Sequence, residues 1–546
     1  MKGKAIIVFS LLLFSIFLFN ENSGYLGAKA LNTYPVHNIS TGLSYSSIQE
    51  AIDAPQTFGG NTILVDAGTY EYNTTVDVDK SLAIIGSGRD TTVIDGGGES
   101  LVVYVDANDV LFEGFNVENG IVGVYVGGYS NCILQENSVT DIFSYENFGY
   151  AIWAVYTENL TVNQNIVGPN NSSGILVSNS LNFTVSGNYV HDDSGYGINA
   201  NASSDGLITG NNAYRNFYDG IGLSAGSHDV TITGNDINNN TEFGVDVIDS
   251  DCVNNLMYDN NIINNGNQAS VSDVSENRWD NGVEGNYWSN YTGVDQYHDG
   301  IGDTPYVLSA DDADNYPLMG PISVFATSLG FDVDVVSNSS IASFAYFLWN
   351  GTVVMQVETE AGAQIYGFCR VSLPHGLLGE PYSVTVDGAD PLYLNTTVFD
   401  DGVSRWIYFL YQQGVHEVVI LGQSPPVAVS IISPENKTYT ASDVPFAFTV
   451  NEETSLLAYS LDGRANVTIT GNVTLSGVSN GNHTLELYAR NSFGDTSASG
   501  IVHFTVSVAG FGVFPFLVAA AVAVVFVLAV VLVYFRKLRR KRAKKG

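Results

Sequence analysis

One motif returns at a nearly constant spacing between residues 120 and 266. In each return a short polar-flanked strand ends at an Asn, a loop follows, and a small residue then precedes an apolar pair. The small residues are 28, 23, 23, 23 and 24 positions apart, at Gly123, Ala151, Gly174, Gly197, Gly220 and Gly244. A second series keeps step with them, at Asn137, Asn165, Asn188, Asn211, Asn235 and Asn260. A fixed period of about 23 residues indicates a solenoid.

The apolar residues within each period alternate or come as β-branched pairs, as in residues 230–233. This pattern favours strands over helices. Helical repeats are longer, at about 33 residues or more, and the Leu frame of leucine-rich repeats is missing. We therefore predict a right-handed parallel β-helix. Its Asn series should stack at one corner, with each Asn in a left-handed backbone conformation and its amide bonded to the Asn above and below.

Several segments resemble the pectin-lyase-like β-helix superfamily, in particular its NosD-like repeats of the carbohydrate-binding and sugar-hydrolase (CASH) type. The resemblance rests on YSSIQEAIDA (45–54), NTILVDAGTYEY (61–72), NDVLFEGFNVENG (108–120) and a Trp-, Tyr- and Asp-rich segment at 277–321 that is similar to the closing segment of NosD-like archaeal surface proteins. It implies a β-helix whose outer face binds or cleaves polysaccharides. The NosD name also implies copper handling.

The composition changes along the chain predict a mainly β protein of several domains. The β-helix should be closed at its start by a helix over 46–52 with Ser46 as N-cap. Alternating strands separated by Gly, Asp and Pro follow it and predict two β-sandwiches, the second of which resembles immunoglobulin-like (Ig-like) modules. The expected domains are the β-helix at 31–276, the closing segment at 277–321, a β-sandwich at 322–422 and an Ig-like sandwich at 427–508.

Both ends of the chain carry targeting signals. Residues 1–30 read as a secretory signal peptide; an uncleaved anchor is the alternative. Residues 514–535 contain no charge and are long enough for one transmembrane helix. Eight Lys or Arg follow within 536–546, which predicts a cytoplasmic tail. We expect a single-pass membrane protein whose bulk is extracellular.

The formal net charge is −36, and only nine Lys or Arg face 55 Asp or Glu between residues 31 and 535. Such a surface repels nucleic acid. Glycans or cell-envelope proteins are the expected partners, besides the membrane. The three cysteines are too few for a disulfide framework and should be buried thiols.

One mixed-charge cluster on the predicted β-helix is a candidate catalytic site. His191, Asp192 and Asp193 precede the next coil's Arg215, which is the one basic residue between Arg89 and Arg278. These residues could serve a glycoside hydrolase or a polysaccharide lyase as acid and base. The alternative, which we favour, is an interstrand ion pair and a protein that binds without catalysis. Copper is disfavoured because the His, Met and Cys residues are scattered.

The closing segment contains a candidate calcium loop. Carboxylates of Asp295, Asp299 and Asp303, with the carbonyl of Ile301, resemble a DxDxDG site. Tyr297 and His298 replace the Asp and Gly usual in the family, so a plain turn cluster is the alternative. No other cofactor is expected.

Two surface features complete the predictions. An insert at Phe143–Gly149 carries aromatic residues that could form a sugar platform or simply pack. Asn-x-Ser/Thr sequences are frequent, and the glycosylation candidates are Asn73, Asn159, Asn182, Asn290, Asn338, Asn395, Asn466 and Asn482.

Overall fold

The computed structural model of the chain describes residues 34–508 and 524–537, apart from internal gaps at 73, 146–147, 273–275, 360–364, 424–426, 451–453 and 492–495. The expected signal peptide lies outside the described residues. The chain divides into two compact units, Met1–Ile322 and Ser323–Gly546. Each unit is described by itself.

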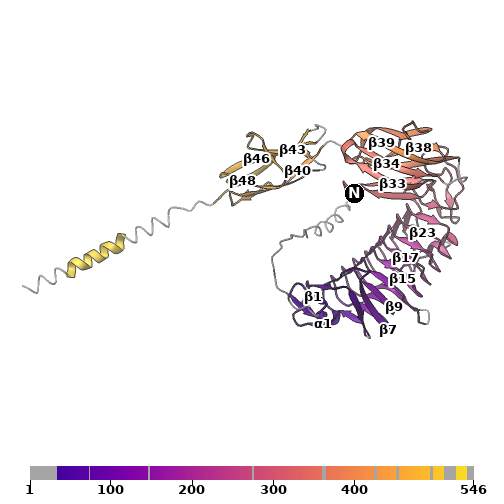
Figure 1. Ribbon diagram of the computed structural model, residues 1–546, viewed down its shortest axis with the longest axis horizontal. Helices are drawn as coiled ribbons and strands as arrows, with labels where there is room; N and C mark the ends of the chain where they lie inside the picture. The colour runs from indigo at the N-terminus through magenta and orange to yellow at the C-terminus, as the bar shows by residue number, and fades with distance from the viewer. Residues whose placement is uncertain are drawn as a thin grey trace, which may run out of the picture. The chain divides into compact units, whose positions relative to one another are not determined.

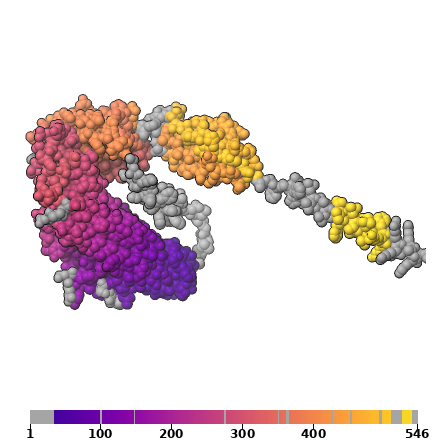
Figure 2. Space-filling model, turned by 180° about the vertical axis from the view of Figure 1, so that it is seen from behind, coloured from indigo at the N-terminus to yellow at the C-terminus, as the bar shows by residue number. Residues whose placement is uncertain are grey.

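The first unit is a parallel β-helix, as predicted, and each full coil contributes one strand to each of three columns (Figure 1). Figure 2 shows the stacked coils as one continuous body from indigo to magenta. The first column runs through β3 (Thr62–Val65), β6 (Ala83–Gly86), β8 (Leu111–Glu113), β10 (Ile133–Gln135), β13 (Thr161–Asn163), β16 (Thr184–Ser186), β19 (Leu207–Thr209), β22 (Thr231–Thr233) and β25 (Leu256–Tyr258).

The other two columns share the long strands β7 (Thr92–Val105) and β9 (Asn116–Gly127). The second column contains β4 (Gly68–Glu71), β11 (Ser138–Thr140), β14 (Ile166–Val167), β17 (Tyr189–His191), β20 (Asn212–Tyr214), β23 (Asp236–Asn238), β26 (Asn261–Ile263) and β28 (Tyr287–Trp288). The third column contains β5 (Val76–Val78), β12 (Tyr150–Val155), β15 (Ser173–Ser178), β18 (Ile198–Asn201), β21 (Ile221–Ser224), β24 (Phe243–Val247) and β27 (Asn267–Val271).

The interior is a set of aliphatic stacks, because the middle residue of each short strand points inward. In the first column Val185 pairs with Ile208, which pairs with Ile232, and all three are fully buried. Their flanking neighbours are half-buried and, except for Leu207, polar, which is the alternation that the sequence displayed. Burial of these aliphatic side chains, at about 25 cal/mol per Å², is the main stabilising term of the solenoid.

The Asn ladder is confirmed. The backbone N–H and the Nδ2 of Asn188 both donate to Oδ1 of Asn211, at 2.9 Å each, and Asn211 repeats both bonds to Asn235. Each Nδ2 also donates to a backbone carbonyl inside the helix, Val185 O in the case of Asn211. The ladder continues beyond the prediction, from Asn260 to Asn286.

The left-handed backbone, however, is wrong for the ladder residues themselves. The positive φ angles fall on the residue before each ladder Asn, for example Gln164 (54°), Gly187 (62°) and Gly210 (63°). This corner residue reverses the chain direction, and the Asn that follows can then point inward. Gly is free of strain in such a conformation, which explains two of these positions.

The recurring small residues are also explained by close contact between coils. A Cβ built on Gly220 would lie 2.4 Å from Ile237 Cγ2, 2.7 Å from Asn240 Nδ2 and 2.8 Å from Gly244 O. Gly197 and Gly244 meet the equivalent backbone and Asn atoms of their next coils. These three positions are therefore glycine because the adjacent coil leaves no room for a side chain.

A second inward ladder was not predicted. It occupies another corner and consists of Asn170, Asp193, Asn216, Asn240 and Asn265. Asp193 is the one carboxyl among these amides and is fully buried, and its oxygens have no hydrogen bond of good geometry within the described residues. Burial raises the pKa of Asp193 well above its usual value, although the adjacent Asn170 opposes the shift.

The N-terminal end is covered by β1 (Val36–Asn38), β2 (Leu43–Tyr45) and α1 (Ile48–Asp53). The N-cap prediction was wrong by one residue. Ser47 caps the helix by accepting from Glu50 N, and the Glu50 carboxylate accepts in return from Ser46 N and Oγ. Ile48, Ala51 and Ile52 close the apolar end of the first coil.

The other end is covered by the closing segment, which includes β29 (Tyr306–Val307) and β30 (Ala313–Asp314). Trp279 and Trp288 are fully buried here, with ring centroids 5.7 Å apart. The buried Asp314 carboxylate accepts from the Trp288 indole at 2.8 Å and from Asn286 N at 2.7 Å. Desolvation nevertheless raises its pKa to about 6.

The second unit contains antiparallel sheets, as the strand patterns predicted. Two sheets face each other across a shared apolar core that includes Val335, Met355 and Phe409. The five-stranded sheet contains β31 (Ile322–Ala326), β32 (Asp332–Ser337), β35 (Tyr366–Pro374), β37 (Tyr393–Asp400) and β38 (Ser404–Gln412). The four-stranded sheet contains β33 (Ser340–Phe347), β34 (Thr352–Glu358), β36 (Gly379–Val386) and β39 (Val415–Gln423), with η1 (Leu348–Asn350) between its first two strands.

A further all-β module follows, with a smaller core around Phe446, Leu485 and Phe504. Its strands are β40 (Val429–Ser433), β41 (Thr438–Tyr439), β42 (Val444–Val450), β43 (Thr454–Leu461), β44 (Val467–Ile469), β45 (Val473–Leu475), β46 (Gly481–Asn491), β47 (Thr496–Ala498) and β48 (Val502–Val506). The expected transmembrane span falls partly outside the described residues, and 524–537 are helical. Within the described part of the chain, no helix has the length and apolarity to cross a membrane.

The glycine contacts predict a sharp contrast between two neighbouring positions. Gly220→Ala should cost roughly 1–3 kcal/mol of unfolding free energy, because its Cβ overpacks against the next coil. Gly222→Ala is the matched control, since the nearest atom lies 3.6 Å away, and it should change stability by less than about 0.5 kcal/mol. Denaturant unfolding of the two variants measures this; equal stability would contradict the packing account.

Asp193→Asn should stabilise the solenoid at neutral pH, because an amide can donate to Asn216 Oδ1 as the other ladder members do. We expect a gain of roughly 1–3 kcal/mol at pH 8. A carboxyl with a raised folded-state pKa binds its proton more tightly when folded, so its penalty is absent below the unfolded value of about 3.9 and grows as pH rises. Unfolding of both proteins from pH 4 to 8 tests this. An advantage for the variant that is independent of pH would contradict it.

Candidate functional site

A strip of aromatic side chains lines the outer face of the third column. Tyr104, Tyr125 and Trp153 occupy one register position on successive coils. Their ring centroids are 5.3 Å apart for the first pair and 4.8 Å for the second. All three residues are half-buried, so each keeps part of its surface accessible to solvent. We call Tyr104, Tyr125 and Trp153, with Phe148 and Tyr150, the aromatic strip.

The predicted aromatic insert supplies the edge of this strip. Phe148 contacts Trp153 edge-on at 5.3 Å and Tyr150 at 5.5 Å, and it remains 43% exposed. Tyr145 of the same insert is 63% exposed. The insert thus packs against the solenoid and also extends its aromatic surface, and its use as a sugar platform stays a prediction.

Polar groups continue the same face on later coils. The register runs from Trp153 through Leu176 and Asn199 to Gly222 and then Asp246. Beside it, Ser178 donates to Asn201 Oδ1, and Asn201 Nδ2 donates to Ser224 Oγ at 2.9 Å. Hydroxyl and amide groups of this kind bind hydroxyl-rich ligands and supply no strong acid or base.

One carboxyl pair interrupts this neutral surface, and the sequence reasoning missed it. Asp219 and Asp246 lie on adjacent coils, close enough to affect each other's titration, and Asp219 accepts from Phe243 N at 3.2 Å. Burial and the neighbouring Asp246 raise the pKa of Asp219 to about 7, and burial raises that of Asp246. Both shifts have the direction expected for neighbouring carboxyls, because two adjacent carboxylates disfavour full ionisation. The feature of the sequence that could have pointed to this pair is the position of Asp219, which directly precedes a motif glycine.

The predicted mixed-charge cluster is only partly assembled. Arg215 Nη2 lies 2.7 Å from Asp192 Oδ1 on the preceding coil, and His191 Nδ1 lies 2.8 Å from Asp192 Oδ2. Arg215 holds the pKa of Asp192 below its usual value. Asp193, in contrast, points into the ladder and cannot join them. What remains is one exposed ion pair with a histidine, which contributes at most about 1 kcal/mol.

The candidate calcium loop does not bring its carboxylates together. Asp295 accepts from the backbone N–H groups of Asp299 and Gly300, Asp299 accepts from Ile301 N, and Asp303 accepts from Gln296 N. Each carboxylate therefore stabilises a turn of its own loop. Because a calcium ion needs these oxygens to converge, the described geometry fits a turn cluster better than a cation site, and calcium binding stays a prediction.

Donors for copper do not converge either. Within the described residues, the one group of three or more His, Cys, Asp or Glu with ligand atoms within 4.8 Å is Asp249, Asp251 and Cys252. Two hard carboxylates and one thiol do not form the soft site that copper prefers. The three cysteines are free and buried, as predicted, and burial raises the pKa of each thiol, to about 11 for Cys369.

The glycosylation candidates occupy different surroundings. Asn159 and Asn182 belong to an exposed stack in which each Nδ2 bonds the Asn of the previous coil. Asn338 uses both ends of its amide, as a donor to Tyr366 O and as an acceptor from Phe368 N. Asn73 lies outside the described residues. Modification of Asn290, Asn395, Asn466 and Asn482 likewise stays a prediction.

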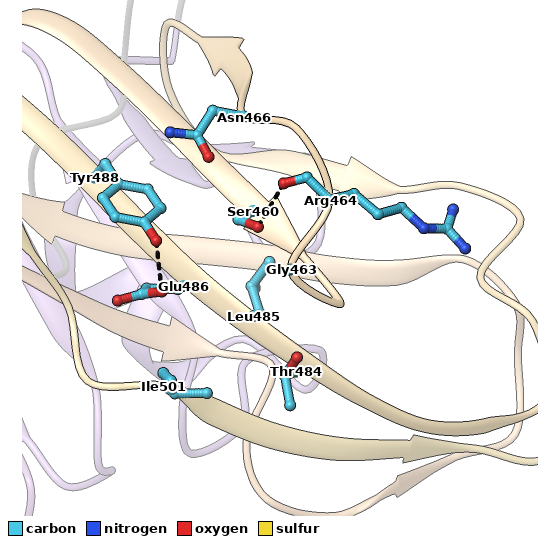
Figure 3. A pocket seen from close by; sticks show the side chains of 9 residues that line it. All are labelled: Ser460, Gly463, Arg464, Asn466, Thr484, Leu485, Glu486, Tyr488 and Ile501. Atoms are coloured by element: carbon cyan, nitrogen blue, oxygen red, sulfur yellow. Dashed lines mark hydrogen bonds between the residues drawn. The ribbon is translucent and has the colours of Figure 1, made fainter.

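The last module contains a shallow cavity of about 270 Å³ next to Asn466 (Figure 3). Tyr488 donates to Glu486 and Ser460 to the carbonyl of Arg464, while the Arg464 side chain extends away from them. These two hydrogen bonds are the ones drawn between the labelled residues, and the cavity carries no site assignment.

Comparison with known proteins agrees with this architecture. The family described as "Periplasmic copper-binding protein (NosD)" matches residues 56–243 and 142–293. A "Cell surface glycoprotein" of the archaeon Methanothermus fervidus is 34% identical over 122 residues, which are 22% of this chain and 19% of that protein. The chain thus spans about a fifth of this relative's length.

Solved structures of similar shape are distant. The A-module of the mannuronan C-5 epimerase AlgE4 from Azotobacter vinelandii is 20% identical with a TM-score of 0.34, over 42% of this chain and 75% of that one. The DFA-IIIase of Arthrobacter chlorophenolicus is 16% identical with a TM-score of 0.33, over 44% and 71%. Residues 56–293 of this chain are thus similar to the NosD family, and the same residues form a parallel β-helix.

Proposed function

We propose that this chain is a cell-surface protein whose β-helix binds neutral glycans along the aromatic strip without cleaving them. The observation that carries the proposal is the register of Tyr104, Tyr125 and Trp153 on three successive coils. Half-exposed aromatic faces offer large rigid contact area at low entropic cost. The coil spacing of about 4.8 Å gives an elongated ligand successive platforms.

The charge of the solenoid supports neutral glycans over polyuronates. Arg215 is the one basic residue between 90 and 277, and its guanidinium is bonded to Asp192. Near the strip, Asp106 accepts from Tyr129, and the Asp219–Asp246 pair lies further along the same face. A polymer that carries a carboxylate on each sugar would be repelled and would find no free cation there.

The carboxyl geometry argues against the alternative, a polysaccharide-cleaving enzyme. Retaining and inverting hydrolases hold their two carboxyls about 5 Å or more apart, on either side of the scissile bond. Asp219 is buried, with 2% of its surface exposed, so a polysaccharide on the outer face cannot reach it as one carboxyl of such a pair. The His191, Asp192 and Arg215 group lacks the second carboxylate that the sequence reasoning had assigned to it.

Localisation at the cell surface is supported by the archaeal glycoprotein relative. Anchoring by residues 514–535, with a cytoplasmic tail at 536–546, rests on the absence of charge followed by eight basic residues. In this arrangement the β-sandwich modules separate the solenoid from the membrane and present it to glycans or to other envelope proteins.

Trp153→Ala should weaken binding of a neutral polysaccharide about tenfold, since it removes one aromatic platform worth roughly 1–2 kcal/mol. Titration calorimetry with xylan, mannan and β-glucan provides the measurement, and alginate and polygalacturonate serve as acidic comparisons. Tyr297→Ala is the matched control, because Tyr297 is a 77% exposed aromatic residue outside the strip.

The outcomes separate the parts of the proposal. Binding of polyuronates that depends on Trp153 would refute the neutral class and keep the site. Equal affinities of the Trp153 variant, the Tyr297 variant and the unchanged protein would refute the strip. Release of reducing ends or unsaturated sugars from any of these polymers would favour the enzyme.

The membrane arrangement predicts the result of protease treatment. Protease added to intact cells should remove the solenoid and both β-sandwich modules and leave a small fragment that contains 514–546. Detection uses one antibody against the solenoid and one against the tail. A solenoid that stays protected until the cells are lysed would contradict the orientation.

A further inference from the structure

The two β-sandwich modules carry the same small assembly, although their sequences differ. Each has an Asp-Gly turn, Asp387-Gly388 in one module and Asp462-Gly463 in the other, with the Asp at φ 52° and 56°. In each, the Asp carboxylate accepts a backbone N–H from the facing strand, from Glu417 at 2.9 Å and from Thr484 at 3.0 Å.

A histidine completes each assembly. His416 Nδ1 lies 2.7 Å from Asp387 Oδ2, and His483 Nδ1 lies 2.8 Å from Asp462 Oδ2. The opposite ring nitrogen faces the backbone carbonyl four residues earlier, Gln412 O at 2.9 Å or Ser479 O at 2.7 Å. We call each Asp, His and carbonyl group a histidine clamp.

Both nitrogens of each ring therefore face acceptors. A neutral imidazole has one N–H, so it can satisfy one acceptor and must present a lone pair to the other. The imidazolium has two N–H groups and satisfies both. At His483, the two acceptors therefore favour the charged form of the ring.

The groups around His483 are consistent with this preference for the charged form. Asp462 and the Ser479 carbonyl raise the pKa of His483 against the opposing effects of burial and Arg464. Tyr459 lines the same cavity of about 190 Å³, which reaches His483 and Asp462 and admits solvent. Around His416 the titratable neighbours are Asp387, Glu417 and Tyr411, and the Glu417 carboxylate is bonded to Gln356.

We propose that the histidine clamp of His483 is a pH-sensitive latch, which holds the Asp462-Gly463 turn closed against its facing strand in mildly acidic medium and loosens as the pH rises. For His483 the sign follows from linkage. Its folded-state pKa is raised, so its stabilisation is complete below the unfolded value of about 6.5 and is lost as pH rises through the folded value.

Hydrogen exchange of the full chain, read by mass spectrometry, tests the latch. After correction for the intrinsic rate, the Thr484 and Asp462 amides should exchange roughly tenfold faster at pH 8.5 than at pH 5.5, because the neutral imidazole gives up one of its two ring hydrogen bonds. The Asn211 amide is the internal control, because it also donates to a side-chain oxygen but no titrating group is involved. It should show no such change.

Three variants make the result specific. His483→Gln should remove the pH dependence at Thr484, and so should Asp462→Asn, which keeps an acceptor oxygen for that amide. His503→Gln should leave it intact, because the exposed His503 pairs with Thr484 across the sheet outside the clamp. The proposal is overturned if exchange at Thr484 is independent of pH in the unchanged protein. It is also overturned if this exchange keeps its pH dependence in both clamp variants.

Discussion

The hydrogen bond between stacked, buried Asn side chains is the constraint on which the solenoid depends. An unpaired amide in this interior would cost about 1–3 kcal/mol, so each Asn requires a partner on the next coil. Asn188, Asn211 and Asn235 meet this requirement through two bonds to the same Oδ1 and one bond to an interior carbonyl. Three features of the coil make this stacking possible: its length, the left-handed corner residue before each Asn, and the absent Cβ of the motif glycines.

Because the interior and the ladders hold the coil, the outward positions are free to carry function. The third column uses this freedom on its early coils for aromatic residues and on its later coils for Ser, Asn and Asp side chains. In the β-sandwich modules, a single side chain also connects a turn to the neighbouring strand, because Asp387 and Asp462 each accept a hydrogen bond from a backbone N–H of that strand. Function on such a chain depends on register, since neighbours in space are about 23 residues apart in sequence.

The register of successive coils also explains which structural features could be predicted from the sequence. The first ladder was predictable because one Asn recurs per period. The second ladder was hidden by Asp193 and by other loop Asn residues. Asp193 was assigned to the outer face because it follows Asp192 directly, but Asp192 has a φ of 56°, and this corner conformation turns the next side chain inward. The Asp219–Asp246 pair depends on contact between coils that spacing alone does not specify.

The central claim is that glycans bind where the aromatic residues are in register on the third column. A crystal structure of the protein soaked with a neutral oligosaccharide tests it most directly. The account predicts sugar rings stacked on Tyr125 and Trp153, with the chain of sugars running along the solenoid axis. Sugar density confined to other surfaces, with the aromatic strip bare, would contradict it.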